Sequence, residues 1–175
     1  MSSKPRSAVQ RYFAGLAENT FQSELGVVDP PLIDYLSDLL VRFVRSDVVH
    51  RIRSVTGKPL MSVGEMVGEA TERIGEARSE LYRHIGDFTL FWAGVYPEAL
   101  RDDQTTQFDD YCCQGKRSYH LASQLEIENQ EKQEEALVLE RLSCQFDLCC
   151  YGLREVRRQW ETGGGEDGGR VILIG

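Results

Sequence analysis

The sequence predicts an all-α protein, a bundle of five to six helices followed by a flexible glycine-rich tail. Apolar side chains recur every three to four residues along most of the 175-residue chain, which is the spacing of one face of an α-helix. Capping residues, glycines and prolines divide this pattern into segments, and the body of the chain has no alternating pattern typical of strands. We therefore expect one helical domain over residues 1–161 and a tail over residues 162–175.

Two amphipathic helices are expected in the first third of the chain. The first covers about residues 8–25 and ends at Gly26, because glycine commonly terminates a helix. The second begins after Asp29, which can cap it, and has Pro30 in its first turn, where the missing N–H costs nothing. Its apolar stripe predicts a helix that reaches the neighbourhood of Arg53.

Residues 62–96 predict a long central helix that opens with a capping box, Ser62 with Glu65. Its apolar seam consists of Val63, Val67, Ala70, Ile74, Ala77, Leu81, Ile85, Phe88 and Trp92. A second stripe, ~140° away and expected to face water, consists of Glu65, Glu69, Glu72, Glu76 and Glu80. One helix of this length would span ~50 Å, and each helical glycine costs about 1 kcal/mol. We therefore allow a kink or break near Gly75, and Pro97 marks the end.

Two more helices are expected, at about residues 105–126 and 134–160, joined by a highly charged run. The first has small residues on its seam, among them Gly115, which would let neighbouring backbones approach closely. The glycine-rich, acidic tail predicts a flexible linker. Its apolar tip at 171–174 is either disordered or docks on this domain, a second subunit or a partner.

Composition and charge disfavour several classes of protein. The chain is 41% hydrophobic and 27% charged, which is ordinary for a globular protein. With a net charge of -8 and a pI near 5.0 it repels phosphate backbones, so nucleic acid is a disfavoured partner. No segment approaches the ~20 apolar residues of a membrane span. The five cysteines, two pairs of which are adjacent, indicate a reduced cytoplasmic protein.

One polar group stands where the charged surface of the central segment gives way to apolar residues. Glu80, His84 and Asp87 share a helix face at ~100° per residue, and a carboxylate one turn from a histidine can orient its ring. This face coincides with the glutamate stripe, which favours a solvated ridge at the lip of the core. The alternative is a ligand pocket mouth, with a lining of Phe91, Trp92 and Tyr96.

A second candidate site is a basic stretch that could bind an anion, although such stretches are usually solvated. It consists of Arg42, Arg45, Arg51 and Arg53. The cysteines and histidines lack the spacing of a structural zinc site, and the chain has no nucleophile elbow, phosphate loop or dinucleotide fingerprint. We therefore assign no catalytic residue, metal or cofactor.

The leading hypothesis for function is a non-enzymatic interaction module that binds a protein partner or forms a homo-oligomer. It follows from long apolar seams, an acidic ridge and the lack of recognisable chemical motifs. Two alternatives stay open. The first is a bundle that binds a small ligand or cofactor, and is then possibly enzymatic, with its pocket mouth at Glu80, His84 and Asp87. The second is a weak anion or nucleic-acid binder that uses the arginines between residues 42 and 53.

Overall fold

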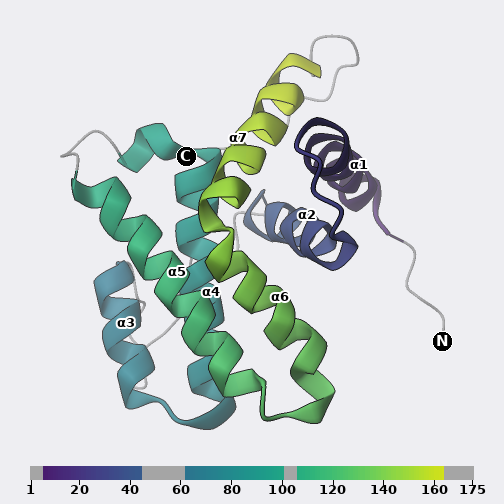
Figure 1. The fold of residues 1–175 in the computed structure, drawn as a ribbon. Coiled ribbons are helices and arrows are strands. Elements are labelled where there is room, and N and C mark those ends of the chain that lie inside the picture. The colour runs from purple at the N-terminus through teal and green to yellow at the C-terminus, as the bar shows by residue number, and fades with distance from the viewer. Residues whose placement is uncertain (1–5, 45–61, 101–105, 164–175) are drawn as a thin grey trace.

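The structure, a computed structural model, describes residues 6–44, 62–100 and 106–163. These ranges are helical almost throughout and contain no strand (Figure 1), which confirms the all-α fold class. They contain seven α-helices: α1 Ala8–Glu18, α2 Pro30–Val44, α3 Val63–Glu72, α4 Gly75–Val95, α5 Thr106–Glu126, α6 Gln133–Cys144 and α7 Phe146–Gly163. Shorter helical turns lie at Asn19–Glu24, Pro97–Leu100 and Gln130–Lys132. None of the described helices is both long and apolar enough to cross a bilayer.

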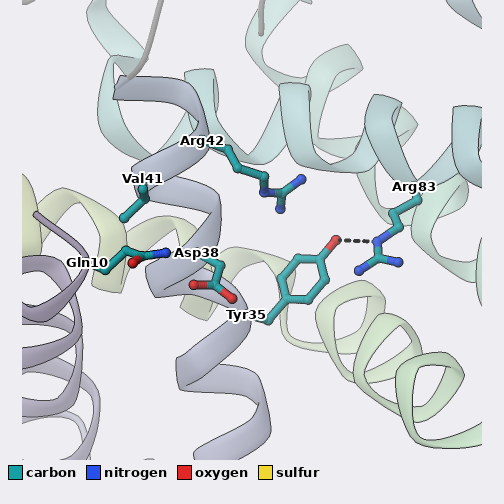
Figure 2. Close-up of a pocket in the computed structure, with 6 residues that line it drawn as sticks. All are labelled: Gln10, Tyr35, Asp38, Val41, Arg42 and Arg83. Atoms are coloured by element: carbon teal, nitrogen blue, oxygen red, sulfur yellow. Dashed lines mark hydrogen bonds between the residues drawn. The ribbon is translucent and has the colours of Figure 1, made fainter. Parts of the chain in front are cut away.

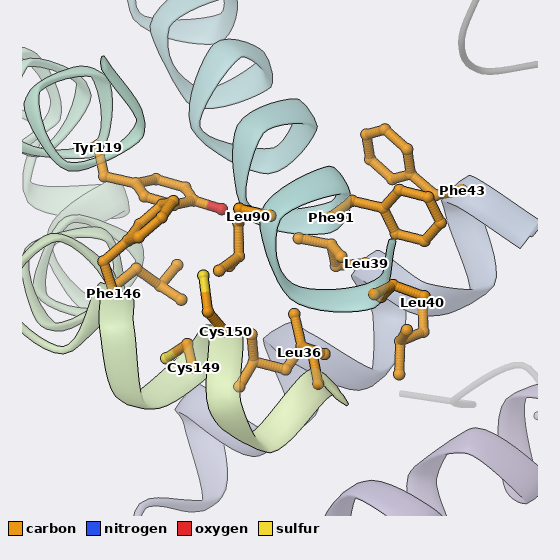
Figure 3. Close-up of a cluster of buried hydrophobic side chains, with 14 of the residues drawn as sticks. Leu36, Leu39, Leu40, Phe43, Leu90, Phe91, Tyr119, Phe146, Cys149 and Cys150 are labelled. Atoms are coloured by element: carbon orange, nitrogen blue, oxygen red, sulfur yellow. The ribbon is translucent and has the colours of Figure 1, made fainter. Parts of the chain in front are cut away.

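Helix α4 is the centre of the bundle. It packs against α5 along its length and also contacts α2, α3 and α7 (Figure 1). The core lies between these helices and draws side chains from all of them. Figure 3 shows part of this core, with Leu36, Leu39, Leu40 and Phe43 from α2, Leu90 and Phe91 from α4, Tyr119 from α5, and Phe146, Cys149 and Cys150 from α7.

Local sequence signals account for several of the helix ends. Ser7 caps α1 by accepting a hydrogen bond from the backbone N–H of Gln10. The helix continues through a π-helical turn at Asn19–Glu24 and stops before Gly26, whose φ is +67°, as expected from the sequence. The capping box of Ser62 and Glu65 is also present at the start of α3.

The break allowed near Gly75 divides residues 62–96 into two helices. Arg73 and Ile74 have extended backbones, and Gly75 has a φ of +58°, a conformation that costs glycine little. Helix α3 therefore folds back beside α4 (Figure 1). The expectation of one helical phase through this segment was wrong, since Ile74, placed on the apolar seam, is 85% exposed.

The segment expected as one helix at 134–160 is also divided. Gln145 has φ -109° and ψ 23° and separates α6 from α7. Its backbone N–H still donates to the carbonyl of Arg141 at 2.8 Å, and its own carbonyl accepts from Cys149 at 2.9 Å. The interruption is therefore one residue long, and it brings the number of α-helices above the expected five to six.

Glycines allow close approaches between helices of the bundle. A Cβ placed on Gly115 of α5 would lie 2.4 Å from Thr89 Oγ1 of α4 and 2.5 Å from the ring of Phe146 of α7. A Cβ on Gly86 of α4 would lie 2.6 Å from the ring of Tyr119. Gly115, the small residue expected on the seam of α5, is thus a point of close contact between helices, as the sequence predicted.

Candidate functional site

Asp87 is buried in the core, with 1% of its surface exposed. Three donors surround its carboxylate: the hydroxyls of Tyr35 and Tyr119 donate to Oδ1 at 2.6 and 2.7 Å, and Arg42 Nη1 donates to Oδ2 at 2.8 Å. A buried carboxylate needs such partners, because an unpaired charge is costly away from water. The expectation that Asp87 continues a solvated ridge was therefore wrong.

The burial of Asp87 follows from a change in the surroundings of α4 along its length. Glu76 and Glu80, in its first half, are exposed as expected. In its second half α2 packs against the same side of the helix. Tyr35 and Arg42 of α2 are seven residues apart, two helical turns, and both reach Asp87 from there.

A second arginine joins the network through Tyr35. Arg83 Nε donates to the Tyr35 hydroxyl at 3.2 Å, and Arg83 Nη1 pairs with Glu135 at 3.2 Å. The guanidinium carbons of Arg42 and Arg83 lie 5.7 and 5.2 Å from the centroid of the Tyr35 ring, within the range of a cation–π contact. Two arginines from different helices are thus held around one tyrosine.

The protonation of the two tyrosines fits their role as donors. Burial raises the pKa of Tyr35, and the negative charge of Asp87 raises it further. The same two causes raise the pKa of Tyr119 well above its ordinary value. Both hydroxyls therefore keep their protons and donate to Asp87, so neither is suited to act as a general acid near neutral pH.

An open cleft of about 330 Å³ lies next to this network, between α1, α2 and α4. Figure 2 shows Tyr35 in its middle, with the hydroxyl turned toward Arg83 and the Asp38 carboxylate away from that arginine. The lining consists of Gln10 from α1, Tyr35, Asp38, Val41 and Arg42 from α2, and Arg83 from α4. The cleft therefore presents both cationic and anionic groups to a small molecule.

No family model, curated protein or solved structure matches the chain. Function must therefore be inferred from the chemistry of the site. The described residues contain no group of three or more His, Cys, Asp or Glu side chains that could hold a metal ion. The cleft and the network behind it bring two arginines, two tyrosines and two aspartates together.

The three residues proposed from sequence as a pocket mouth, and the three aromatic residues proposed as its lining, are not among those that line the cleft. Glu80 is exposed and His84 is partly buried, whereas Asp87 lies behind the cleft and bonds to its lining. The three aromatic residues pack on one another: the rings of Phe91 and Tyr96 are 5.8 Å apart, and those of Trp92 and Tyr96 are 5.9 Å apart. Burial of aromatic surface thus explains why Phe91, Trp92 and Tyr96 occur at these positions.

The proposed basic stretch contributes one described residue to the cleft. Arg42 lines it and also pairs with Asp87, so the two sequence-based candidate sites meet at this ion pair. Arg45, Arg51 and Arg53 lie outside the described residues, as does the apolar tip at 171–174.

Sequence reasoning missed most of the cleft lining. Tyr35, Asp38 and Arg42 stand at i, i+3 and i+7 in α2, which places them on one helix face. This polar face, beside the leucine stripe, was a usable signal. No signal in the sequence indicated that Arg83 and Tyr119, 48 and 84 residues beyond Tyr35, would share its surroundings.

His84 lies next to the network without bonding to it. Its ring stacks on Phe43, with centroids 6.2 Å apart, and is 6.4 Å from the ring of Phe88. Burial lowers the pKa of His84 below its ordinary value. The charge of Asp87 acts in the opposite direction and that of Arg42 in the same direction, and the net shift is downward.

His84 is expected to make the fold less stable in mild acid. Because its pKa is lower in the folded chain, the unfolded chain binds more protons below about pH 6.5, and the free energy of unfolding falls as pH drops. His84→Gln should flatten part of this decline between about pH 7 and pH 5 in urea denaturation. An NMR titration of the imidazole checks the cause directly, and a midpoint at or above about 6.5 would contradict it.

Proposed function

We propose that this protein binds a small polar ligand in the cleft between α1, α2 and α4. The observation that carries the proposal is that Arg42 and Arg83, from two helices, are both held at one cleft by bonds that lead to Asp87. Ligand clefts begin at about 300 Å³, so a cleft of about 330 Å³ suits a small molecule. The ligand site kept as an alternative in the sequence analysis, with its mouth at Glu80, His84 and Asp87, is thereby moved to this neighbouring cleft.

The network supports binding because it fixes the positions of the two arginines. A buried ion pair adds little net stability compared with apolar residues of the same size. It does fix the position of a guanidinium group, and a fixed donor loses less conformational entropy when a ligand arrives. Asp87 holds Arg42 directly and Arg83 through Tyr35, so both are oriented before any ligand binds.

The proposal can be tested by NMR on the full chain with a library of small polar metabolites. A ligand of the cleft should shift the amide signals of Gln10, Asp38 and Arg83, and Arg83→Gln should abolish its binding. Arg141→Gln is the matched control: like Arg83, Arg141 pairs with an acidic side chain, that of Asp29, and its side chain is 35% exposed against 32% for Arg83. If no compound shifts the cleft signals, the proposal is wrong.

A second candidate function is the interaction module expected from sequence. Its support is a set of exposed apolar side chains on α6 and α7, called here the α6–α7 patch: Leu137, Leu148 and Tyr151, and Cys144, which lies between them in sequence, is exposed as well. We propose self-association through this patch in the cytoplasm, where the five free cysteines would stay reduced. Light scattering should then show a dimer or larger species that Tyr151→Glu converts to monomer, and a wild-type monomer would rule this candidate out.

A further inference from the structure

We infer that the ligand of this cleft is a small zwitterion of amino-acid type. Its carboxylate would bind the guanidinium groups of Arg42 and Arg83, and its ammonium group would bind the carboxylate of Asp38. This inference rests on the proposed function and names the ligand class of the same cleft.

The basic side of the cleft retains hydrogen-bond donors. A guanidinium group has five N–H donors in a planar fork that suits a carboxylate. Among the described residues Arg42 uses Nη1 for Asp87, and its side chain is 40% exposed. Arg83 uses Nε for Tyr35 and Nη1 for Glu135. Each arginine therefore keeps N–H groups for a ligand without breaking its bonds to the network.

The acidic side of the cleft is provided by Asp38. It stands one turn before Arg42 in α2, yet Arg42 bonds to Asp87 instead. Within the described ranges Asp38 forms no ion pair or hydrogen bond, and it is exposed at the cleft. A carboxylate that is not neutralised by the nearest arginine is available to a cationic group of a ligand.

The two sides together select the ligand class. A simple anion at the arginines would be repelled by Asp38, and a simple amine at Asp38 would be repelled by Arg42 and Arg83. A molecule with both charges a few bonds apart avoids both penalties. Gln10 adds a neutral contact: its Oε1 accepts from the Ser7 backbone N–H at 2.7 Å, which leaves its Nε2 hydrogens free to donate to a ligand oxygen.

Size and net charge agree with a small zwitterion. A volume of about 330 Å³ is at the lower end of the range for ligand clefts. The chain carries a net charge of -8, which disfavours a polyanion but not a ligand whose own charges cancel. Val41, an apolar residue in the lining, can contact the hydrocarbon part of such a ligand.

The test compares matched probes on the full chain. The twenty common amino acids are titrated one at a time by NMR, and every binder is compared with the α-hydroxy acid and the decarboxylated amine of the same skeleton. We expect at least one amino acid to bind in the cleft and both analogues to bind about tenfold more weakly or worse, which is the effect of losing a charged hydrogen bond.

The variant that tests the acidic side is Asp38→Asn. It should weaken binding of the amino acid about tenfold, whereas binding of the hydroxy acid should not weaken, because the substitution removes the carboxylate that repels it. Asp34→Asn is the matched control, because Asp34 is an exposed aspartate of α2 that pairs with Arg6 and does not line the cleft. Thermal unfolding of both variants checks that the exposed substitutions leave the fold intact.

The possible outcomes separate this inference from the proposed function. If the hydroxy acid binds as tightly as its amino acid, or if only compounds of another class shift the cleft signals, the zwitterion inference is wrong and the ligand cleft stands. An Asp38→Asn variant that binds amino acids normally also overturns the inference. If nothing binds in the cleft, both are overturned.

Discussion

Asp87→Ala is expected to lower the free energy of unfolding by about 3 kcal/mol. Breaking a buried ion pair typically costs about 3–5 kcal/mol, and the lower end applies because Arg42 is 40% exposed and can turn toward water. The Tyr119 hydroxyl cannot turn toward water in the same way, because Tyr119 is fully buried and its O–H would lose its acceptor. Urea denaturation followed by circular dichroism measures the loss.

The control for this variant is Asp34→Ala. Asp34 is an exposed aspartate of α2 that pairs with Arg6 at the surface, at 3.6 Å, and its replacement should change stability by about 0.5 kcal/mol or less. If Asp87→Ala costs less than about 1 kcal/mol, the three donors have found other partners and the network does not hold the helices together.

Gly115→Ala is expected to destabilise the fold by about 1–3 kcal/mol, although alanine is the better helix former. The added methyl group would lie 2.4 Å from Thr89 Oγ1 and 2.5 Å from the ring of Phe146, and both side chains are fully buried. Relief of the clash requires α5 to move away from α4 and α7. The shift in the denaturation midpoint measures the cost.

Gly68→Ala is the matched control, with an effect of opposite sign. Gly68 is exposed in the middle of α3, and no atom lies within 4 Å of a Cβ placed there. This variant should gain about 0.5–1 kcal/mol from helix propensity alone. Stabilisation by Gly115→Ala as well would show that α5 is packed more loosely than the close contacts indicate.

Much of the helical architecture was predictable because it depends on local interactions. The capping residue Ser62 and the stop at Gly26 act through their own backbone neighbours. Apolar periodicity likewise located α5, since one face of a helix must meet the core. The break at Gln145 was not predictable in this way, because apolar spacing continues across a single interrupted residue.

The candidate site was less predictable because its partners are distant in sequence. A helical wheel places Asp87 on the same side of the helix as Glu80, and the two differ in burial because side chains of α2 and α5 close over Asp87. The bonds of Asp87 reach residues 45 and 52 positions earlier, at Arg42 and Tyr35. A single sequence contains no information on such pairings beyond the types of residue present.

The carboxylate of Asp87 joins three helices at one point: Tyr35 and Arg42 belong to α2, Asp87 to α4 and Tyr119 to α5. If α2 detached while α4 and α5 stayed folded, the Asp87 carboxylate would lose two of its three donors, and a charge left unpaired in the core is costly. These three helices should therefore open as one cooperative unit, and hydrogen exchange of their core amides should report one common free energy of opening.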